Sequence, residues 1–61
     1  MVDLKKIREQ QEMTQIQLGE KTGLSNSYIS MIENKERRPS VDAAMRIAKA
    51  LGFKWTLFFE K

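Results

Sequence analysis

Two short helices joined by a tight turn are the structure that this sequence specifies most clearly. Thr14 is a preferred N-cap residue of a helix, and Gln17 three positions later completes a capping box. Gly23 ends this first helix, because a tight exit needs a positive φ angle that glycine adopts at the least cost. Ser25 is the cap of the next helix. The pattern predicts helices over about residues 15 to 22 and 26 to 34.

The apolar positions predict how these two helices pack. Ile29 and Ile32 lie three positions apart and turn one face of the second helix inward. Gly19 falls where the second helix would cross the first, and only a small side chain fits so close a crossing. Met13 and Leu18 occupy the positions of a hydrophobic staple at the start of the first helix. The outward face of the second helix then carries polar groups and one thioether, on Asn26, Ser27, Tyr28, Ser30 and Met31.

The remaining segments are also spaced as helices. Leu4 and Ile7 share one face of a predicted helix over about residues 3 to 12. Ser40 caps a further helix that Gly52 ends. One stripe of this helix is formed by Val41, Ala44, Ala48 and Leu51. A short last helix or turn is expected over residues 54 to 60.

The length of the chain bounds its architecture. Sixty-one residues make one domain at most. A chain of this size buries only about 60% of the surface that its unfolded form exposes, so its core is marginal. The sequence has no strand-like alternation, internal repeat or low-complexity segment. We therefore predict an all-α fold, a compact bundle of five short helices that occupies residues 1–61 as a single domain.

The composition argues against an enzyme. The sequence contains no cysteine and no histidine, so it lacks thiolate ligands, the commonest general base and the commonest metal ligand. No pair of carboxylates is set in an evident cleft. We therefore expect no catalytic residue, no cofactor and no metal. No apolar run approaches the roughly 18 residues of a membrane span, and the N-terminus has no signal-peptide pattern, so an intracellular protein without a membrane partner is expected.

The net charge is mildly basic. It is +3 with an isoelectric point near 9.5, which permits a polyanionic partner without requiring one. The distribution of charge is more informative, because Lys35, Arg37 and Arg38 cluster directly after the second of the two paired helices. Each of these charges taken singly is also compatible with an ordinary solvated surface.

The ordered set of motifs carries a family resemblance. The pieces that fit best are Thr14-Gln15, Leu18-Gly19, Gly23, Ser25, Ile29, Ile32-Glu33-Asn34, Pro39-Ser40 and residues 47 to 52. From about Leu4 to Phe59 the chain resembles the Cro/repressor-type helix-turn-helix family of phage and bacterial transcription regulators. The resemblance implies a lambda-repressor-like DNA-binding domain in the cytoplasm, with the helix over 26 to 34 in the major groove of double-stranded DNA.

The same resemblance assigns roles to individual residues. It implies base reading by Asn26, whose amide matches the edge of adenine, by Ser27, and by Met31, which can meet a thymine methyl group. Contacts with the DNA backbone are expected from Gln15, Tyr28, Ser30, Asn34, Arg37 and Arg38. Other readings exist: Asn26 and Ser27 also help to cap helices, and methionine often fills gaps in a core. The ring of Tyr28 could likewise lie on the edge of the core.

Two further pairs follow from the resemblance. Arg8 and Glu33 are expected to form a structural ion pair between the first and third helices, with two separate surface charges as the alternative. Trp55 and Leu57 are the candidates for a dimer interface, because a short last helix cannot turn every apolar residue into a small core. The alternative places Trp55 in the core and leaves Leu57 as a scattered exposed residue. Phe58 is expected in the core.

One position departs from the family pattern. The family usually has glycine after the Glu-Asn pair of the third helix, where this chain has Lys35. Either Asn34 or Lys35 must then adopt the left-handed conformation, or the helix must run further.

We interpret the chain as a sequence-specific DNA-binding transcription regulator, a repressor that binds an inverted-repeat operator as a homodimer. The alternative is a protein-interaction module of the same fold, such as an antitoxin or an adaptor. The polar outer face of the helix over 26 to 34 and the basic loop after it favour DNA.

Overall fold

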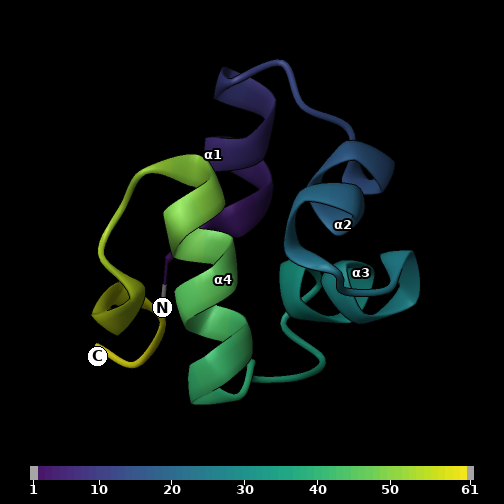
Figure 1. Ribbon diagram of the computed structural model, residues 1–61. Helices are drawn as coiled ribbons and strands as arrows, with labels where there is room; N and C mark the ends of the chain where they lie inside the picture. The colour runs from purple at the N-terminus through teal and green to yellow at the C-terminus, as the bar shows by residue number, and fades with distance from the viewer. Residues whose placement is uncertain (1, 61) are drawn as a thin grey trace.

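The computed structural model describes residues 2–60, which form four α-helices and one short 3-10 helix without any strand (Figure 1). The elements are α1 (Leu4–Gln10), α2 (Gln15–Thr22), α3 (Asn26–Glu33), α4 (Val41–Leu51) and η1 (Trp55–Phe58). The predicted all-α class is confirmed, whereas the predicted count of five helices is corrected to four α-helices, with a one-turn 3-10 helix where a short last helix or turn was expected. The last element is a four-residue 3-10 helix without a side-chain cap, and one turn is too short to nucleate an α-helix.

The helix caps explain where α2, α3 and α4 begin. The Thr14 capping box is complete, because Gln17 N donates to Thr14 Oγ1 at 3.0 Å and Thr14 N donates to Gln17 Oε1 at 2.8 Å. The hydroxyl of Ser25 accepts from the backbone N–H of Tyr28, and that of Ser40 accepts from a backbone N–H in the first turn of α4. The predicted starts of these three helices are therefore confirmed.

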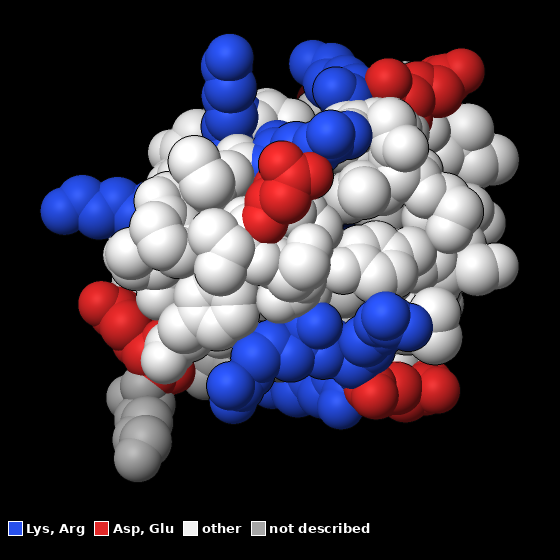
Figure 2. Space-filling model, turned by 60° about the horizontal axis from the view of Figure 1, so that its bottom comes forward, with Lys and Arg blue, Asp and Glu red and all other residues white. Residues whose placement is uncertain are grey.

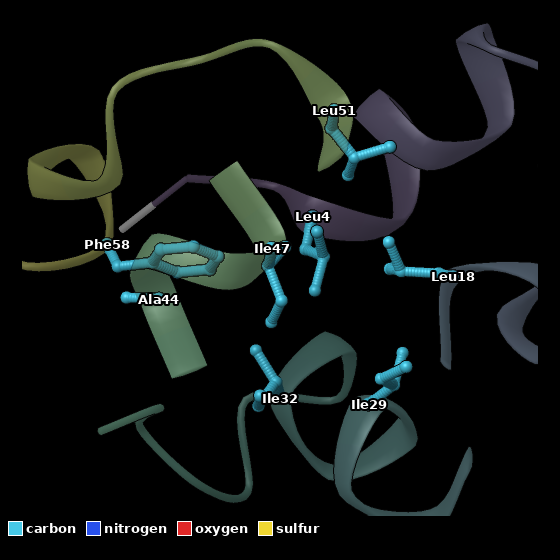
Figure 3. Packing of buried hydrophobic residues seen from close by; sticks show 8 residues of the cluster. All are labelled: Leu4, Leu18, Ile29, Ile32, Ala44, Ile47, Leu51 and Phe58. Carbon is cyan, nitrogen blue, oxygen red and sulfur yellow. The ribbon is translucent and has the colours of Figure 1, made fainter. Parts of the chain in front are cut away.

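The core lies where all five elements meet (Figure 3). Figure 1 shows α4 in the middle of the molecule, with α2 and α3 on one side and η1 on the other. The buried cluster takes residues from every element: Leu4, Leu18, Ile29, Ile32, Ala44, Ile47, Leu51 and Phe58. The expected burial of Phe58 is confirmed. Side chains far apart in the sequence thus close one small core.

The predicted inward stripe of α4 is wrong at its first position. Val41 is 52% exposed, although it shares a helical spacing with buried Ala44 and Leu51. The stripe that packs inward also takes in Ala43 and Ile47, so the buried face is turned away from the first residue of the helix. Periodicity alone cannot show that Val41 lies beyond the reach of the core.

Two non-glycine residues adopt a left-handed backbone at helix ends. Lys35 has a φ of 61°, so it is the residue that leaves α3 in the conformation for which the family uses glycine. Glu12 has a φ of 56° and follows α1, which ends at Gln10 and not at the predicted residue 12. The side chain of Gln11 connects the end of α1 to the end of α4, because its Nε2 donates to the carbonyl of Leu51 at 2.6 Å.

Gly19 allows the close contact between α2 and the turn that follows it. A Cβ atom at this position would lie 2.8 Å from the carbonyl oxygen of Leu24, inside the closest approach that real structures allow. The δ-methyl of Ile29 would be 3.6 Å away. The expectation that only a small residue fits at position 19 agrees with this geometry, although the nearest neighbour is backbone of the turn.

We expect Gly19→Ala to lower the free energy of unfolding by about 1 kcal/mol or more, measured by urea denaturation. Alanine gains about 1 kcal/mol of helix propensity over glycine, but overpacking against a backbone oxygen costs about 1–3 kcal/mol. Glu20→Ala, at the exposed neighbouring position, is the control and should change stability by less than about 0.5 kcal/mol. A Gly19→Ala protein as stable as the parent would contradict the close contact.

Candidate nucleic-acid interface

The outer face of α3 presents the side chains predicted to read DNA. Asn26 and Ser27 are exposed, whereas Ser30 and Met31 are half-buried. Within residues 2–60, neither Asn26 nor Ser27 uses its side chain in a hydrogen bond. The N-cap role belongs to Ser25, so the two following residues are not needed as caps. Their hydrogen-bonding groups are free to meet a partner in solution.

Tyr28 is engaged within the chain. Its half-buried ring packs against the core, and its hydroxyl oxygen accepts from the backbone N–H of Ser40 at 3.1 Å. The guanidinium of Arg37 lies 5.3 Å from the centre of the ring. The sequence reading that put this ring on the edge of the core agrees with this position. The hydroxyl hydrogen of Tyr28 can still be donated outward.

The loop between α3 and α4 carries the basic cluster of Lys35, Arg37 and Arg38, all of which are exposed. In Figure 2, which brings the bottom of Figure 1 forward, several Lys and Arg side chains form one dense group along the lower side, with acidic side chains beside it and other Lys and Arg side chains apart from it. Aromatic rings hold two of the three, since Arg37 lies over Tyr28 and Arg38 lies 6.0 Å from the ring of Phe59. The loop thus holds positive charge beside the end of α3.

A hydrogen-bonded network joins α1, α2 and α3 underneath this face. Arg8 binds Glu33 with two parallel bonds, from Nε to Oε2 at 2.6 Å and from Nη2 to Oε1 at 3.1 Å. The Nε2 of Gln15 donates to the same Oε1 of Glu33 at 3.0 Å. Arg8 Nη1 also donates to the carbonyl of Met13 at 2.7 Å. The expected ion pair is therefore present, and Gln15 is its unexpected third member.

Burial makes this network different from a surface ion pair. The side chains of Arg8 and Glu33 are only 9% and 2% exposed. The hydrogen bonds to Glu33 hold the pKa of the Arg8 guanidinium above its ordinary value, although burial alone would lower it. Among residues 2–60, no buried side-chain nitrogen or oxygen lacks a hydrogen-bond partner. Arg8 stays charged, and each of its three guanidinium nitrogens donates a hydrogen bond.

Asn34 lies at the exposed C-terminal cap of α3. Its Nδ2 lies 3.5 Å from the hydroxyl of Ser30, one turn earlier, which is a weak contact. Both side chains can therefore exchange this contact for another partner. Ser30 lies on α3, and Asn34 directly follows the helix and precedes the basic loop.

The dimer candidates lie at the C-terminal end of the chain. Trp55 is half-buried, with its ring edge-on to that of Phe59, and lines an apolar groove of about 490 Å³ together with Met45 and Phe53. Leu57 is half-buried and not exposed as expected, and it lies within the 3-10 helix η1. Both side chains leave apolar surface at this end of the molecule.

Sequence reasoning missed several features of this surface. The spacing of the sequence does not indicate that the Tyr28 hydroxyl accepts a hydrogen bond from the backbone N–H of Ser40. It also does not indicate that Gln15 donates to Glu33 beside Arg8. The sequence motifs also do not single out Ile16, which is 64% exposed at the start of α2. The sequence does contain a signal for this exposure, because Ile16 lies two positions before buried Leu18 and so on the opposite face of α2.

Two other kinds of site find no support in the part of the chain that the structure describes. Residues 2–60 hold no group of three or more acidic residues that could bind a metal ion, and the chain has no histidine or cysteine. No helix within these residues is long enough and apolar enough to cross a membrane.

The geometry of α2 and α3 defines a helix-turn-helix unit, two short helices joined by a three-residue turn that contains glycine. A sequence profile described as helix-turn-helix matches residues 4–58. This match covers most of the chain, and the protein therefore belongs to the helix-turn-helix family of transcription regulators. Members of this family that resemble the chain are regulators and not enzymes.

Curated relatives agree with this assignment. The chain is 42% identical over 57 residues to YqaF of Bacillus subtilis, an uncharacterized HTH-type transcriptional regulator, covering 93% of this chain and 75% of YqaF. It is 43% identical over 49 residues to the immunity repressor protein of Bacillus phage phi105, covering 80% of this chain but 34% of the repressor. An HTH-type regulator of Mycobacterium tuberculosis is 46% identical over 48 residues, which is 34% of its length. The chain thus spans about a third of these last two relatives.

We expect Arg8→Ala to destabilise the protein by about 3 kcal/mol in the absence of DNA, because Glu33 would remain buried without its cationic partner. Urea denaturation followed by circular dichroism measures the loss. The double variant Arg8→Ala with Glu33→Ala should recover part of it, since no uncompensated charge is left.

A matched control uses the exposed ion pair of Arg46 and Asp42, in which Arg46 Nε lies 3.0 Å from Asp42 Oδ2. Asp42→Asn should cost less than about 0.5 kcal/mol. Simple additivity of the Arg8 and Glu33 substitutions would show that the buried pair does not act as one unit.

Proposed function

We propose that the protein is a repressor that recognises a specific double-stranded DNA operator, with α3 inserted in the major groove. The observation that carries this proposal is the free outer face at the start of α3, where Asn26 and Ser27 are exposed and unused within residues 2–60. The helix N-terminus is the part of a recognition helix that meets base edges in this class of protein. The similar proteins are named as a transcriptional regulator and an immunity repressor, which supports the same function.

Base reading is assigned to Asn26, Ser27 and Met31. The Asn26 amide can donate and accept at once, as the N6 and N7 atoms of adenine require. The hydroxyl of Ser27 can pair with several base edges. Met31, one turn later and half-buried, offers its thioether to a thymine methyl group.

Backbone contacts surround these readers. Gln15 stands at the N-terminus of α2, where free backbone N–H groups and the helix dipole favour a phosphate. Further backbone contacts are assigned to Ser30 on α3, to Asn34 at its end, and to Arg37 and Arg38 in the basic loop. Tyr28 can add its hydroxyl hydrogen, because its oxygen already accepts from Ser40. These groups fix the register of the protein on the duplex.

Selection of bound duplexes from a random DNA pool tests the function directly. We expect one enriched motif that the purified protein then binds far more tightly than unrelated DNA. A pool that remains random after repeated rounds would overturn the proposal and favour a protein-interaction module of the same fold, such as an antitoxin or adaptor.

We expect affinity and specificity to depend on different residues. Arg38→Ala should weaken binding to all duplexes about equally and flatten the salt dependence, since log K changes by about −0.9 per phosphate contact with log salt. Asn26→Ala should lose about 1–3 kcal/mol at the preferred site only. Fluorescence anisotropy at several salt concentrations separates the two effects.

Lys49→Ala is the matched control for charge, because Lys49 is exposed on α4. It removes one positive charge away from α3 and should leave the slope nearly unchanged. An Asn26→Ala protein with an unchanged sequence preference would remove Asn26 from the readers.

We further propose that the protein binds its operator as a homodimer. One α3 reads too few base pairs to select a single site, and two copies related by a two-fold axis double the information. The recognition helices should then lie about 34 Å apart, on an inverted repeat whose half-sites are about 10 base pairs apart. The apolar surface of Trp55 and Leu57 is the interface that we assign to this axis.

Leu57→Glu should give a folded monomer that binds the operator much more weakly, because the coupling between half-sites is lost. Leu57 is half-buried but lies outside the apolar residues that pack on the buried cluster, so the charge should not unfold the chain. Sedimentation and helical circular dichroism measure the two properties. Gln10→Glu adds the same charge at an exposed position of α1 and should remain dimeric. A dimeric or unfolded Leu57→Glu protein would place the interface elsewhere.

A further inference from the structure

Ile16 is an apolar side chain in an unusual place. It is 64% exposed, the largest value among the large apolar side chains of residues 2–60 that are classed as exposed. Exposure alone means little, because single apolar residues are common on protein surfaces. Its position is more informative: it follows Gln15 at the start of α2 and lines a shallow hollow of about 460 Å³ together with Asn26.

The hollow lies between the end of α1, the connection before α2, the start of α2 and the first residue of α3. Ile16 and Asn26 therefore border the same hollow, although they are ten positions apart in the chain. Asn26 is the first residue of α3 and the principal base reader of the proposed function. A group that enters this hollow beside Asn26 therefore also meets Ile16.

Local structure gives no reason for isoleucine at this position. A β-branched residue is a weaker helix former than alanine, glutamine or glutamate. The capping box is formed by Thr14 and Gln17 and does not involve the side chain between them. The buried contact of this turn of α2 is made by Leu18. Neither helix propensity nor the core explains the side chain.

We propose that Ile16 is a specificity-determining residue that contacts the 5-methyl group of a thymine beside the base read by Asn26. This inference rests on the proposed insertion of α3 in the major groove. An isoleucine side chain has no hydrogen-bonding group, so it cannot bind a phosphate or a polar base edge. The thymine methyl is the apolar group that base pairs present in the major groove, and its contact with Ile16 removes apolar surface of both from water.

This thymine differs from the one assigned to Met31. Met31 lies more than one turn farther along α3 and does not line the hollow. The two apolar side chains therefore flank Asn26 and Ser27 at opposite ends of the reading face. The protein would then distinguish thymine at two separate positions of each half-site.

Removal of single methyl groups tests the inference. In the operator obtained by selection, each thymine is replaced in turn by deoxyuridine, which lacks only the 5-methyl group. We measure the affinity of the wild-type protein and of Ile16→Ala for each duplex. One methyl contact is worth about fourfold in affinity. The wild type should lose about fourfold at one thymine of each half-site, and Ile16→Ala should lose nothing further there.

Two controls accompany this experiment. Val41→Ala removes another exposed apolar side chain, 52% exposed at the start of α4, and should show the same deoxyuridine profile as the wild type. Met31→Ala should lose its sensitivity at a different thymine. Circular dichroism checks that Ile16→Ala is folded, as an exposed helical position predicts.

The possible outcomes separate this inference from the proposed function. If the wild type binds the operator but no methyl effect depends on Ile16, the contact with thymine is wrong and the proposed function stands. A selected operator without thymine beside the position read by Asn26 has the same meaning. If the wild-type protein selects no duplex at all, the proposed function and this inference both fail.

Discussion

The buried pair of Arg8 and Glu33 is the interaction on which the arrangement of the first three helices depends. A fully charged pair can be buried only when its remaining hydrogen-bonding groups find partners, because desolvation of both ions is costly. The carbonyl of Met13, in the connection before α2, accepts from Arg8. The side chain of Gln15, the first residue of α2, donates to Glu33. The pair therefore stabilises the orientation of α2 and α3 relative to α1, through hydrogen bonds on the buried side of these helices. A core of this size has few other contacts that can define orientation so closely.

The surface above this network divides into a rigid part and an adaptable part. The side chains that position the helices make hydrogen bonds within the protein. The Tyr28 hydroxyl, for example, accepts a hydrogen bond from the backbone N–H of Ser40. Those that face outward at the start of α3, Asn26 and Ser27, are left free. Rigid support below free hydrogen-bonding groups lowers the entropy that recognition would otherwise cost.

Local rules were enough to predict most of the fold. The caps at Thr14, Ser25 and Ser40 act through neighbouring backbone, so the starts of α2, α3 and α4 could be found from the sequence. The exposure of Val41 could not, because it depends on how far the core extends along α4. The third partner of the ion pair, Gln15, was also out of reach, since it arises from the packing of three helices.

The contact at Gly19 also limits how α2 can move relative to the turn that leads to α3. The carbonyl of Leu24 in the turn approaches the backbone of α2 so closely at Gly19 that α2 cannot move relative to this turn without losing the contact. Tightly packed units of this kind move as rigid bodies. The helix-turn-helix unit therefore behaves as one element, and its outer surface is displaced only when the whole unit moves.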